Sequence, residues 1–303
     1  MTLLKKKYFL LIFTSILISC STNPYKKSEK VYDEKLSTIK ETISVKEATS
    51  LQKVEIPETN RDSLYLKQLL KYKDSISKIG GIPLQNGINT EWIGTVNFNL
   101  RKPNFIIIHH TAQDSLQQTI KTFTKNESKV SAHYIISKDG KIVHMLNDYL
   151  RAWHAGISSW GKNTDINSCS IGIELDNNGN EAFTELQINT LLALLTKLKK
   201  DYNIPIENII GHSDIAPTRK QDPSAFFPWK TLASMGFGLW ADEILEEAPP
   251  TFSIEQGLRI IGYNTKNLIA AIKAFKLHYI QTEVDSYLDP KTINTIYNLS
   301  KKQ

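Results

Sequence analysis

Apolar and polar positions in the middle of the chain follow two different periods. Short apolar runs predict β-strands over residues 104–109, 133–137, 141–145 and 170–175. A Lys-Asp-Gly turn over residues 138–140 separates the second run from the third and indicates an antiparallel hairpin. Helical spacing of apolar residues appears between these runs. The pattern therefore predicts an α/β fold, with a mixed central β-sheet flanked by helices.

The clearest helical pattern of this region covers residues 185–202. Thr184 is its expected N-cap, Gln187 would complete a capping box, and Pro205 follows the last turn. A shorter helix is expected over residues 115–126, with its apolar residues on one face. We interpret the shorter helix as structural.

A linker signal, Ala-Pro-Pro over residues 248–250, divides the chain into a main domain and a smaller C-terminal one. We expect the main domain to span residues 81–248 and a small all-α three-helix module to span residues 251–303. Helices are predicted there over residues 253–261, 265–280 and 290–300. Their apolar residues would form a small core of their own, and none of their side chains suggests catalysis.

The N-terminal end has the pattern of a secretory signal, with three lysines before a short apolar run that ends at Ile18. The run is short for a membrane span, and the following Ser19-Cys20 resembles the end of a bacterial lipobox. We therefore expect a signal peptide over residues 1–19, a lipid on Cys20, and attachment to a membrane of the cell envelope, with the outer membrane facing the periplasm favoured. The alternative is an ordinary signal peptide with a chance cysteine.

Residues 20–80 are rich in Lys, Glu, Ser and Thr, which predicts a flexible tether. Within it, residues 61–79 could form a helix that docks on the main domain. The net charge of +6 comes from the first 80 residues, because residues 81–303 hold 22 basic against 22 acidic side chains. This balance argues against nucleic-acid binding. With Cys20 acylated, Cys169 would have no partner for an intrachain disulfide, and we expect it in a strand as a small buried residue, with metal ligation as the alternative.

Two segments about a hundred residues apart carry the candidate chemistry. One predicted strand ends in His109 and His110, where a buried strand passes into a polar loop. The other segment, residues 211–223, combines a histidine, a lysine and aspartates in one loop that proline interrupts. Imidazole and carboxylate groups are zinc ligands, so convergence of the two segments would make a metal site.

Five short motifs occur in an order that resembles the zinc-dependent N-acetylmuramoyl-L-alanine amidases, a family that shares its fold with phage-type amidases and peptidoglycan recognition proteins. The resemblance covers residues 103–237, and the C-terminal helices resemble the peptidoglycan-binding module often joined to such enzymes. The motifs are Ile-Ile-Ile-His109-His-Thr-Ala, Ser-Ala-His133-Tyr, Arg-Ala-Trp153-His154-Ala-Gly, Ser-Ile-Gly-Ile-Glu174-Leu, and Gly-His212-Ser-Asp through Asp222-Pro.

The resemblance implies a Zn²⁺ site formed by His109, His212 and Asp222. Adjacent strand residues face opposite sides, so His110 should point away from the metal. Asp214 lies in the same loop as Asp222 and remains the alternative carboxylate ligand.

Further roles follow from the same resemblance. Glu174 would act as the general base, with an exposed strand-end carboxylate as the alternative reading. Lys220 would stabilise the oxyanion, or would be only a solvated loop lysine. The implied substrate contacts are His133, Trp153, His154 and Arg219.

The implied reaction is hydrolysis of the amide between N-acetylmuramic acid, or its anhydro form, and L-alanine. Peptidoglycan or muropeptides would be the partners of a monomeric enzyme held to a membrane through Cys20. A non-catalytic peptidoglycan receptor of the same fold is the alternative. Such receptors usually lack a metal ligand, whereas all three ligand positions are filled here.

Overall fold

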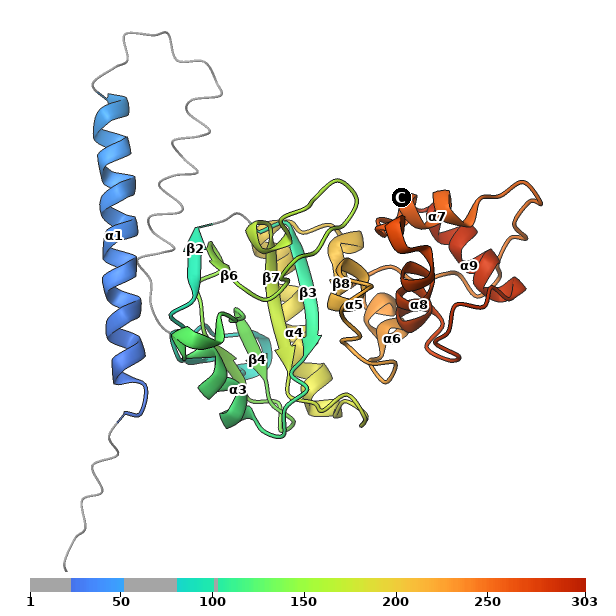
Figure 1. The fold of residues 1–303 in the computed structure, drawn as a ribbon. Helices are drawn as coiled ribbons and strands as arrows, with labels where there is room; N and C mark the ends of the chain where they lie inside the picture. Colours follow the sequence, from blue (N-terminus) through green and yellow to red (C-terminus); the bar gives the residue numbers. More distant parts are fainter. Residues whose placement is uncertain (1–22, 52–80, 101–102) are drawn as a thin grey trace, which may run out of the picture.

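The computed structural model describes residues 23–51, 81–100 and 103–303, which form a sheet with helices on both sides (Figure 1). The strands of the main sheet are β1 (Glu91–Trp92), β3 (Phe105–His110), β4 (Tyr134–Ile136), β5 (Ile142–His144), β7 (Ser170–Leu175) and β8 (Ile209–Gly211). Their order is β1-β5-β4-β7-β3-β8. β4 pairs antiparallel with β5 and parallel with β7, which confirms the predicted hairpin and the mixed sheet.

Helix α4 (Glu185–Tyr202) covers one face of the sheet and has the predicted bounds. Its leucine stripe packs against Ile106 and Ile108 of β3 and against Ile171 and Ile173 of β7. The Thr184 side chain caps the helix by accepting from the Gln187 backbone N–H. The Gln187 side chain does not complete the expected box but donates to backbone carbonyls at the ends of β4 and β7, which ties the helix to the sheet.

Two helices cover the opposite face. Helix α3 (Leu116–Phe123) packs on β4 and β5, inside the range predicted for it. Helix α5 (His212–Ile215) follows β8 directly and packs beside β3. Because side chains alternate along a strand, His109 shares this face with Phe105 and Ile107. The sheet therefore presents His109 toward α5.

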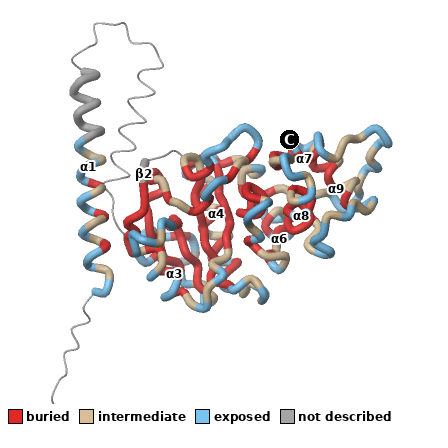
Figure 2. The backbone as a smooth tube through the Cα atoms, viewed as in Figure 1, coloured by how far each residue is buried: buried red, intermediate tan, exposed pale blue. Residues whose placement is uncertain are grey.

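Helix α6 (Trp229–Ser234) lies outside the predicted segments. The three helices after it follow the predicted segments closely, and they are α7 (Ile254–Ile261), α8 (Leu268–Tyr279) and α9 (Pro290–Ser300). The expectation that α7 to α9 would have a separate core is wrong. Their buried residues form one cluster with side chains of β3, β8 and α5, and Figure 2 shows buried chain running from the sheet into these helices.

Short 3₁₀ turns connect several of these elements. They are η1 (Gln85–Gly87), η2 (Asn126–Ser128), η3 (Ile166–Ser168), η4 (Ile206–Asn208) and η5 (Thr265–Asn267). Cys169 caps η3 and is only partly buried, so it lies in the turn before β7 and not in the strand where we expected it. It is not among the residues grouped as a possible metal site within the described chain.

A second, two-stranded sheet is formed by β2 (Phe98–Leu100) and β6 (Leu150–Ala152), and helix α1 (Lys26–Leu51) lies against it (Figure 1). Tyr32 and Leu36 of α1 are buried among Phe98 and Leu150. The segment predicted as a tether thus contains a docked helix, while the helix expected over residues 61–79 and the lipid site Cys20 lie outside the described residues. Among the helices that the structure describes, none has both the length and the apolar character needed to cross a bilayer.

Candidate metal centre and active site

The two candidate segments meet at the carboxyl ends of β3 and β8. Two ring nitrogens and one carboxylate oxygen converge there. His109 Nδ1 lies 2.9 Å from His212 Nδ1 and 3.1 Å from Asp222 Oδ2, and His212 Nδ1 lies 3.0 Å from Asp222 Oδ2. All three residues are buried. They form a group that could hold a metal ion, and the predicted ligand set is therefore brought together in space.

A hydrogen-bond relay fixes which nitrogen of His109 carries the proton. The Ser170 hydroxyl donates to the Ile166 carbonyl at 2.7 Å, so its oxygen accepts from His154 Nε2 at 3.0 Å. His154 Nδ1 is then the acceptor for His109 Nε2–H, 3.0 Å away. The relay leaves the Nδ1 lone pair of His109 directed at His212 and Asp222.

The partner of His212 fixes its proton in the same way. A backbone carbonyl can only accept, so His212 Nε2 donates to Ala155 O at 3.2 Å and Nδ1 keeps its lone pair. Burial, with His212 as a neighbour, lowers the pKa of His109 to about 4, so its imidazole is neutral near pH 7. His109 Nδ1, His212 Nδ1 and Asp222 Oδ2 thus face one another at hydrogen-bond distance, and each has a lone pair when both imidazoles are neutral.

Such a cluster of acceptors fits a cation. Two imidazoles and a carboxylate are a ligand set of catalytic zinc sites, which keep a further position for water or substrate. Tetrahedral donors about 2.0–2.1 Å from zinc lie about 3.3 Å from one another, close to the spacing of the three acceptors. The residues present therefore fit zinc.

Glu174 stands beside this cluster. It pairs with His109 across β7 and β3, and its side chain is buried. Burial, reinforced by the nearby negative charge of Asp222 and opposed by Lys220, raises the pKa of Glu174 to about 8. A carboxyl group with a pKa near neutrality can both take and return a proton under physiological conditions.

Lys220 is partly exposed on the loop between His212 and Asp222. Its positive charge acts on both His109 and Glu174, which places it within electrostatic reach of the cluster. A cation at that position can stabilise negative charge that develops on a substrate oxygen.

Asp214, the alternative ligand, points elsewhere. Its Oδ2 accepts from the Gly211 backbone N–H at 2.7 Å and lies 2.7 Å from His278 Nδ1. The geometry therefore favours Asp222 over Asp214 as the ligand. His110 also stays out of the cluster, as expected, because its Nδ1 accepts from the Ser224 backbone N–H at 3.2 Å.

The expected substrate contacts lie in four different environments. His133 is fully buried between backbone groups, accepting from Gly172 N–H and donating to the Leu150 carbonyl. His154 lies behind His109 in the relay, so its hydrogen bond orients the ring of His109, the proposed metal ligand. Arg219 donates to the carbonyls of Ala155 and Ile157. Trp153 is half-buried, and its indole N–H has no hydrogen-bond partner within the described chain.

Gly172 makes room for the relay. A Cβ atom added there would lie 2.5 Å from Cγ of His154, far inside the contact distance. The absence of a side chain at this strand position lets the His154 ring lie between Ser170 and His109. No pattern in the sequence singles out this glycine or Ser170 for such a role.

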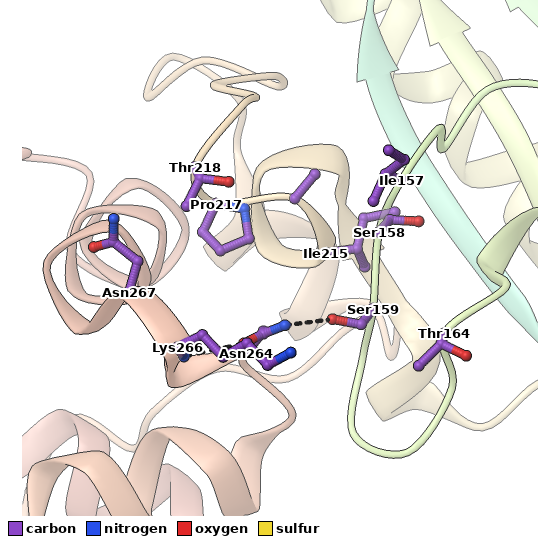
Figure 3. A pocket seen from close by; sticks show the side chains of 11 residues that line it. Ile157, Ser158, Ser159, Thr164, Ile215, Pro217, Thr218, Asn264, Lys266 and Asn267 are labelled. Atoms are coloured by element: carbon purple, nitrogen blue, oxygen red, sulfur yellow. Dashed lines mark hydrogen bonds between the residues drawn. The ribbon is translucent and has the colours of Figure 1, made fainter.

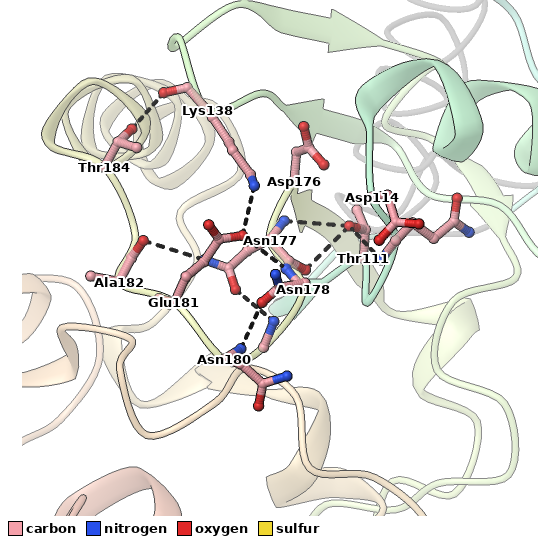
Figure 4. A network of polar contacts seen from close by, with 12 residues as sticks. Thr111, Asp114, Lys138, Asp176, Asn177, Asn178, Asn180, Glu181, Ala182 and Thr184 are labelled. Atoms are coloured by element: carbon pink, nitrogen blue, oxygen red, sulfur yellow. Dashed lines mark hydrogen bonds and ion pairs between the residues drawn. The ribbon is translucent and has the colours of Figure 1, made fainter.

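A polar network holds the loop that follows Glu174 and β7 (Figure 4). Lys138 pairs with Glu181 at 2.6 Å, and the Asn177 side chain donates to the Glu181 carbonyl at 3.2 Å. Gly179 closes the loop over His110, since a Cβ atom there would lie 2.8 Å from the imidazole. The network fixes the course of this loop.

A separate pocket of about 420 Å³ opens between the main domain and the C-terminal helices. Figure 3 shows Asn264 reaching Ser159, which are joined by a hydrogen bond of 3.0 Å. Part of its wall is formed by Pro217 and Thr218, which lie between His212 and Asp222 in the sequence. The three residues of the possible metal group do not line the pocket. The pocket is therefore a neighbour of the metal site and not the site itself.

Comparisons with known proteins give the family. The profile of the family described as N-acetylmuramoyl-L-alanine amidase matches residues 99–225. N-acetylmuramoyl-L-alanine amidase AmiD of Escherichia coli is 34% identical over 219 residues, covering 62% of this chain and 78% of the relative. The chain belongs to the N-acetylmuramoyl-L-alanine amidase family.

Solved structures of similar amidases agree with this assignment. The complex of E. coli AmiD with the substrate anhydro-N-acetylmuramic acid-L-Ala-D-gamma-Glu-L-Lys has a TM-score of 0.61 at 31% identity, covering 66% of this chain and 89% of that one. AMPDH3 of Pseudomonas aeruginosa in complex with anhydromuramic pentapeptide has a TM-score of 0.61 at 28% identity, covering 67% and 93%. Among amidases with a shorter match, AmpD of Haemophilus influenzae is 38% identical over 109 residues, covering 36% of this chain and 59% of the relative.

Proposed function

We propose that this amidase hydrolyses the bond between N-acetylmuramic acid, or its anhydro form, and L-alanine in peptidoglycan, with zinc held by His109, His212 and Asp222. The observation that carries the proposal is the convergence of the His109, His212 and Asp222 side chains beside a buried Glu174. A bound zinc supplies Lewis acidity and makes water more acidic. The remaining tasks fall to the side chains around it.

Glu174 is placed to move protons. It takes a proton from the attacking water as the water oxygen bonds to the amide carbon. It then gives that proton to the amine nitrogen of L-alanine as the C–N bond breaks. Burial raises the pKa of Glu174, which favours return of the proton to the amine, whereas the positive charges of Lys220 and of a bound metal would favour the ionised form that takes the proton from water.

Lys220 is placed to stabilise the negative charge on the former carbonyl oxygen. A charge-assisted donor of this kind contributes most where water is scarce. The buried cluster of His109 and Glu174 next to Lys220 is such an environment. Trp153 is half-buried and its indole N–H is itself buried, so any contact with the substrate would come from the exposed part of its ring.

The substrate proposal rests on the similar amidases. Both complexes named above hold anhydromuramyl peptides, and the fold similarity covers about two thirds of this chain. We propose the same class of muropeptide here, with the intact wall polymer as the other substrate to test. Filled ligand positions and a buried base argue against the alternative, a receptor that binds peptidoglycan without cleaving it.

We further propose that Cys20 carries a lipid and holds the enzyme to the envelope. The sequence pattern of residues 5–20 supports this proposal. α1 begins at Lys26 and its Tyr32 is buried against the main domain. Only the few residues between Cys20 and α1 would then separate the lipid from the docked helix, so the catalytic domain would stay close to the membrane surface.

The direct test is release of free stem peptide from purified peptidoglycan by the protein. It is run with and without a chelator, after zinc is added back, and beside Glu174→Ala. Metal-dependent release that is lost in the variant supports the amidase and the base together. Binding of peptidoglycan with no release in any sample would favour the receptor.

A further inference from the structure

Asp214 joins the two parts of the molecule through a buried carboxylate. Its Oδ2 accepts from Gly211 N–H and from His278 Nδ1, each at 2.7 Å, and its Oδ1 accepts from the Tyr263 hydroxyl at 2.5 Å. Gly211 belongs to β8, whereas His278 belongs to α8 and Tyr263 to the connection between α7 and η5. Residues of the main domain and of the C-terminal region thus satisfy one carboxylate together.

This contact is dry and specific. Asp214 is 0% exposed and His278 is 1% exposed. The His278 ring is stacked between Trp229, at 3.8 Å, and Tyr279, at 4.0 Å, which fixes the direction of its N–H. Its other nitrogen is buried with no partner in the described chain, so the polar role of the ring is the bond to Asp214. Removing one partner of a buried carboxylate is costly, because the desolvated charge remains.

The carboxylate acts directly on the backbone that carries a metal ligand. Gly211 is the N-cap of α5, and His212 is the first residue of that helix. By holding the Gly211 N–H, Asp214 fixes the turn at which β8 ends and His212 leaves the sheet. The four-residue helix is too short to fix this turn by its own hydrogen bonds.

The same contact reaches the second ligand segment. A Cβ atom on Gly211 would lie 2.9 Å from Pro223 and 3.2 Å from Trp229, so these groups already touch the turn. Pro223 follows Asp222, and Trp229 stacks on His278. In addition, Ser213 N–H donates to the Asp222 carbonyl at 2.8 Å. The helical residues therefore support the backbone of both His212 and Asp222.

We infer that the C-terminal helices are part of the metal site's scaffold, and that His278 and Tyr263 act through Asp214 as positioning residues for His212. The module that resembles a peptidoglycan-binding module in sequence would thus help to set metal affinity. The inference rests on the proposed metal site but not on the identity of the substrate.

The test compares metal affinity of variants in the full chain, kept in mild detergent. His278→Phe keeps a ring for the stack and removes the donor, whereas His278→Asn offers a side-chain N–H near the position of Nδ1. Tyr263→Phe removes the other donor. Leu299→Ala is the matched control, because Leu299 is fully buried in the same helical core and is not bonded to Asp214.

Zn²⁺ affinity of the metal-free proteins is measured by competition with a chromophoric chelator, and the Co²⁺ absorption spectrum reports ligand geometry. All measurements are made below the unfolding temperature of every variant. We expect His278→Phe to weaken metal binding about 10-fold or more, the scale seen when groups that orient ligands are removed, and to alter the Co²⁺ spectrum. His278→Asn should recover part of the loss, and Leu299→Ala should lower stability with unchanged affinity.

Two other results have different meanings. Equal Zn²⁺ affinity and spectra for wild type, His278→Phe and Tyr263→Phe would overturn the inference and leave the metal proposal intact. Equal losses in His278→Phe and Leu299→Ala would also overturn it, because the effect would then be general loosening of the module. If the wild type bound no zinc, the proposed metal site itself would fail.

Discussion

His109 and Glu174 occupy paired positions on the neighbouring parallel strands β3 and β7. Paired residues on neighbouring parallel strands point to the same face of the sheet. The register of β3 and β7 therefore puts the proposed base beside a proposed metal ligand. Rigid, buried strands hold both side chains, and the relay through His154 fixes the ring of His109. The sheet thus supplies His109 and Glu174, whereas His212 comes from the start of α5 and Asp222 and Lys220 come from the loop that follows it.

Replacing the proposed base should remove catalysis and keep the metal. Glu174→Gln has nearly the same shape but cannot accept the water proton, so we expect kcat to fall about 10²- to 10⁴-fold. Zinc content should be unchanged. Glu181→Gln, which alters a carboxylate of the following loop that pairs with Lys138, is the control and should keep its activity. Full activity in Glu174→Gln would exclude the proton-transfer role.

The raised pKa of Glu174 has a consequence for the metal-free protein. The folded-state pKa of about 8 lies above the ordinary 4.5, so the folded state holds this proton more tightly than the unfolded state does. The stabilising contribution is complete below the ordinary pKa and is lost as the pH rises through about 8. With chelator present, the Tm advantage of Glu174→Gln over wild type should grow between about pH 5 and about pH 9. An advantage that shrinks over this range would contradict the assignment.

Substituting the glycine under the relay should weaken metal binding. The new Cβ of Gly172→Ala would lie 2.5 Å from His154, so the ring must move and release Nε2 of His109. We expect Zn²⁺ affinity to fall about 10- to 100-fold in a chelator competition. Gly94→Ala is the control, since its Cβ would meet Tyr32 at an ordinary 3.4 Å. Equal affinities in the two variants would show that the relay does not orient His109.

Removing the lysine of the ligand loop should affect the chemical step more than binding. Lys220→Ala takes away the charge proposed to stabilise the developing oxyanion, and we expect kcat to fall about 10²- to 10³-fold with a small change in KM. Steady-state kinetics on a defined muropeptide measures this. Lys230→Ala, at an exposed position of α6, serves as control. A rise in KM at constant kcat would instead assign Lys220 to substrate binding.

The parts of the fold that follow from local pattern were predictable. The helical patterns predicted the bounds of α4 and α9 directly, and the ordered motifs identified the three residues that converge into a group able to hold a metal ion. β8 escaped prediction because only three residues form it before His212 opens α5. The docking of α1 was also missed, because its few apolar contacts interrupt a largely polar segment.

The supporting groups of the site could not be found from the sequence. Asp214 and His278 lie 64 residues apart, and a lone histidine on an apolar helix gives no sign of a partner. His154 occurs beside Trp153 in a motif that suggested substrate contact, whereas its hydrogen bonds connect Ser170 with His109. Such roles depend on which face of the sheet each residue occupies after folding.

The central claim is tested most directly by identifying the bond that the zinc-loaded protein cuts in a defined anhydromuramyl peptide. Mass spectrometry of the products should show the intact peptide with a free amino terminus at L-alanine and the sugar with its lactyl carboxylate. Cleavage at any other bond, or an uncut peptide with zinc bound in full occupancy, would contradict the account.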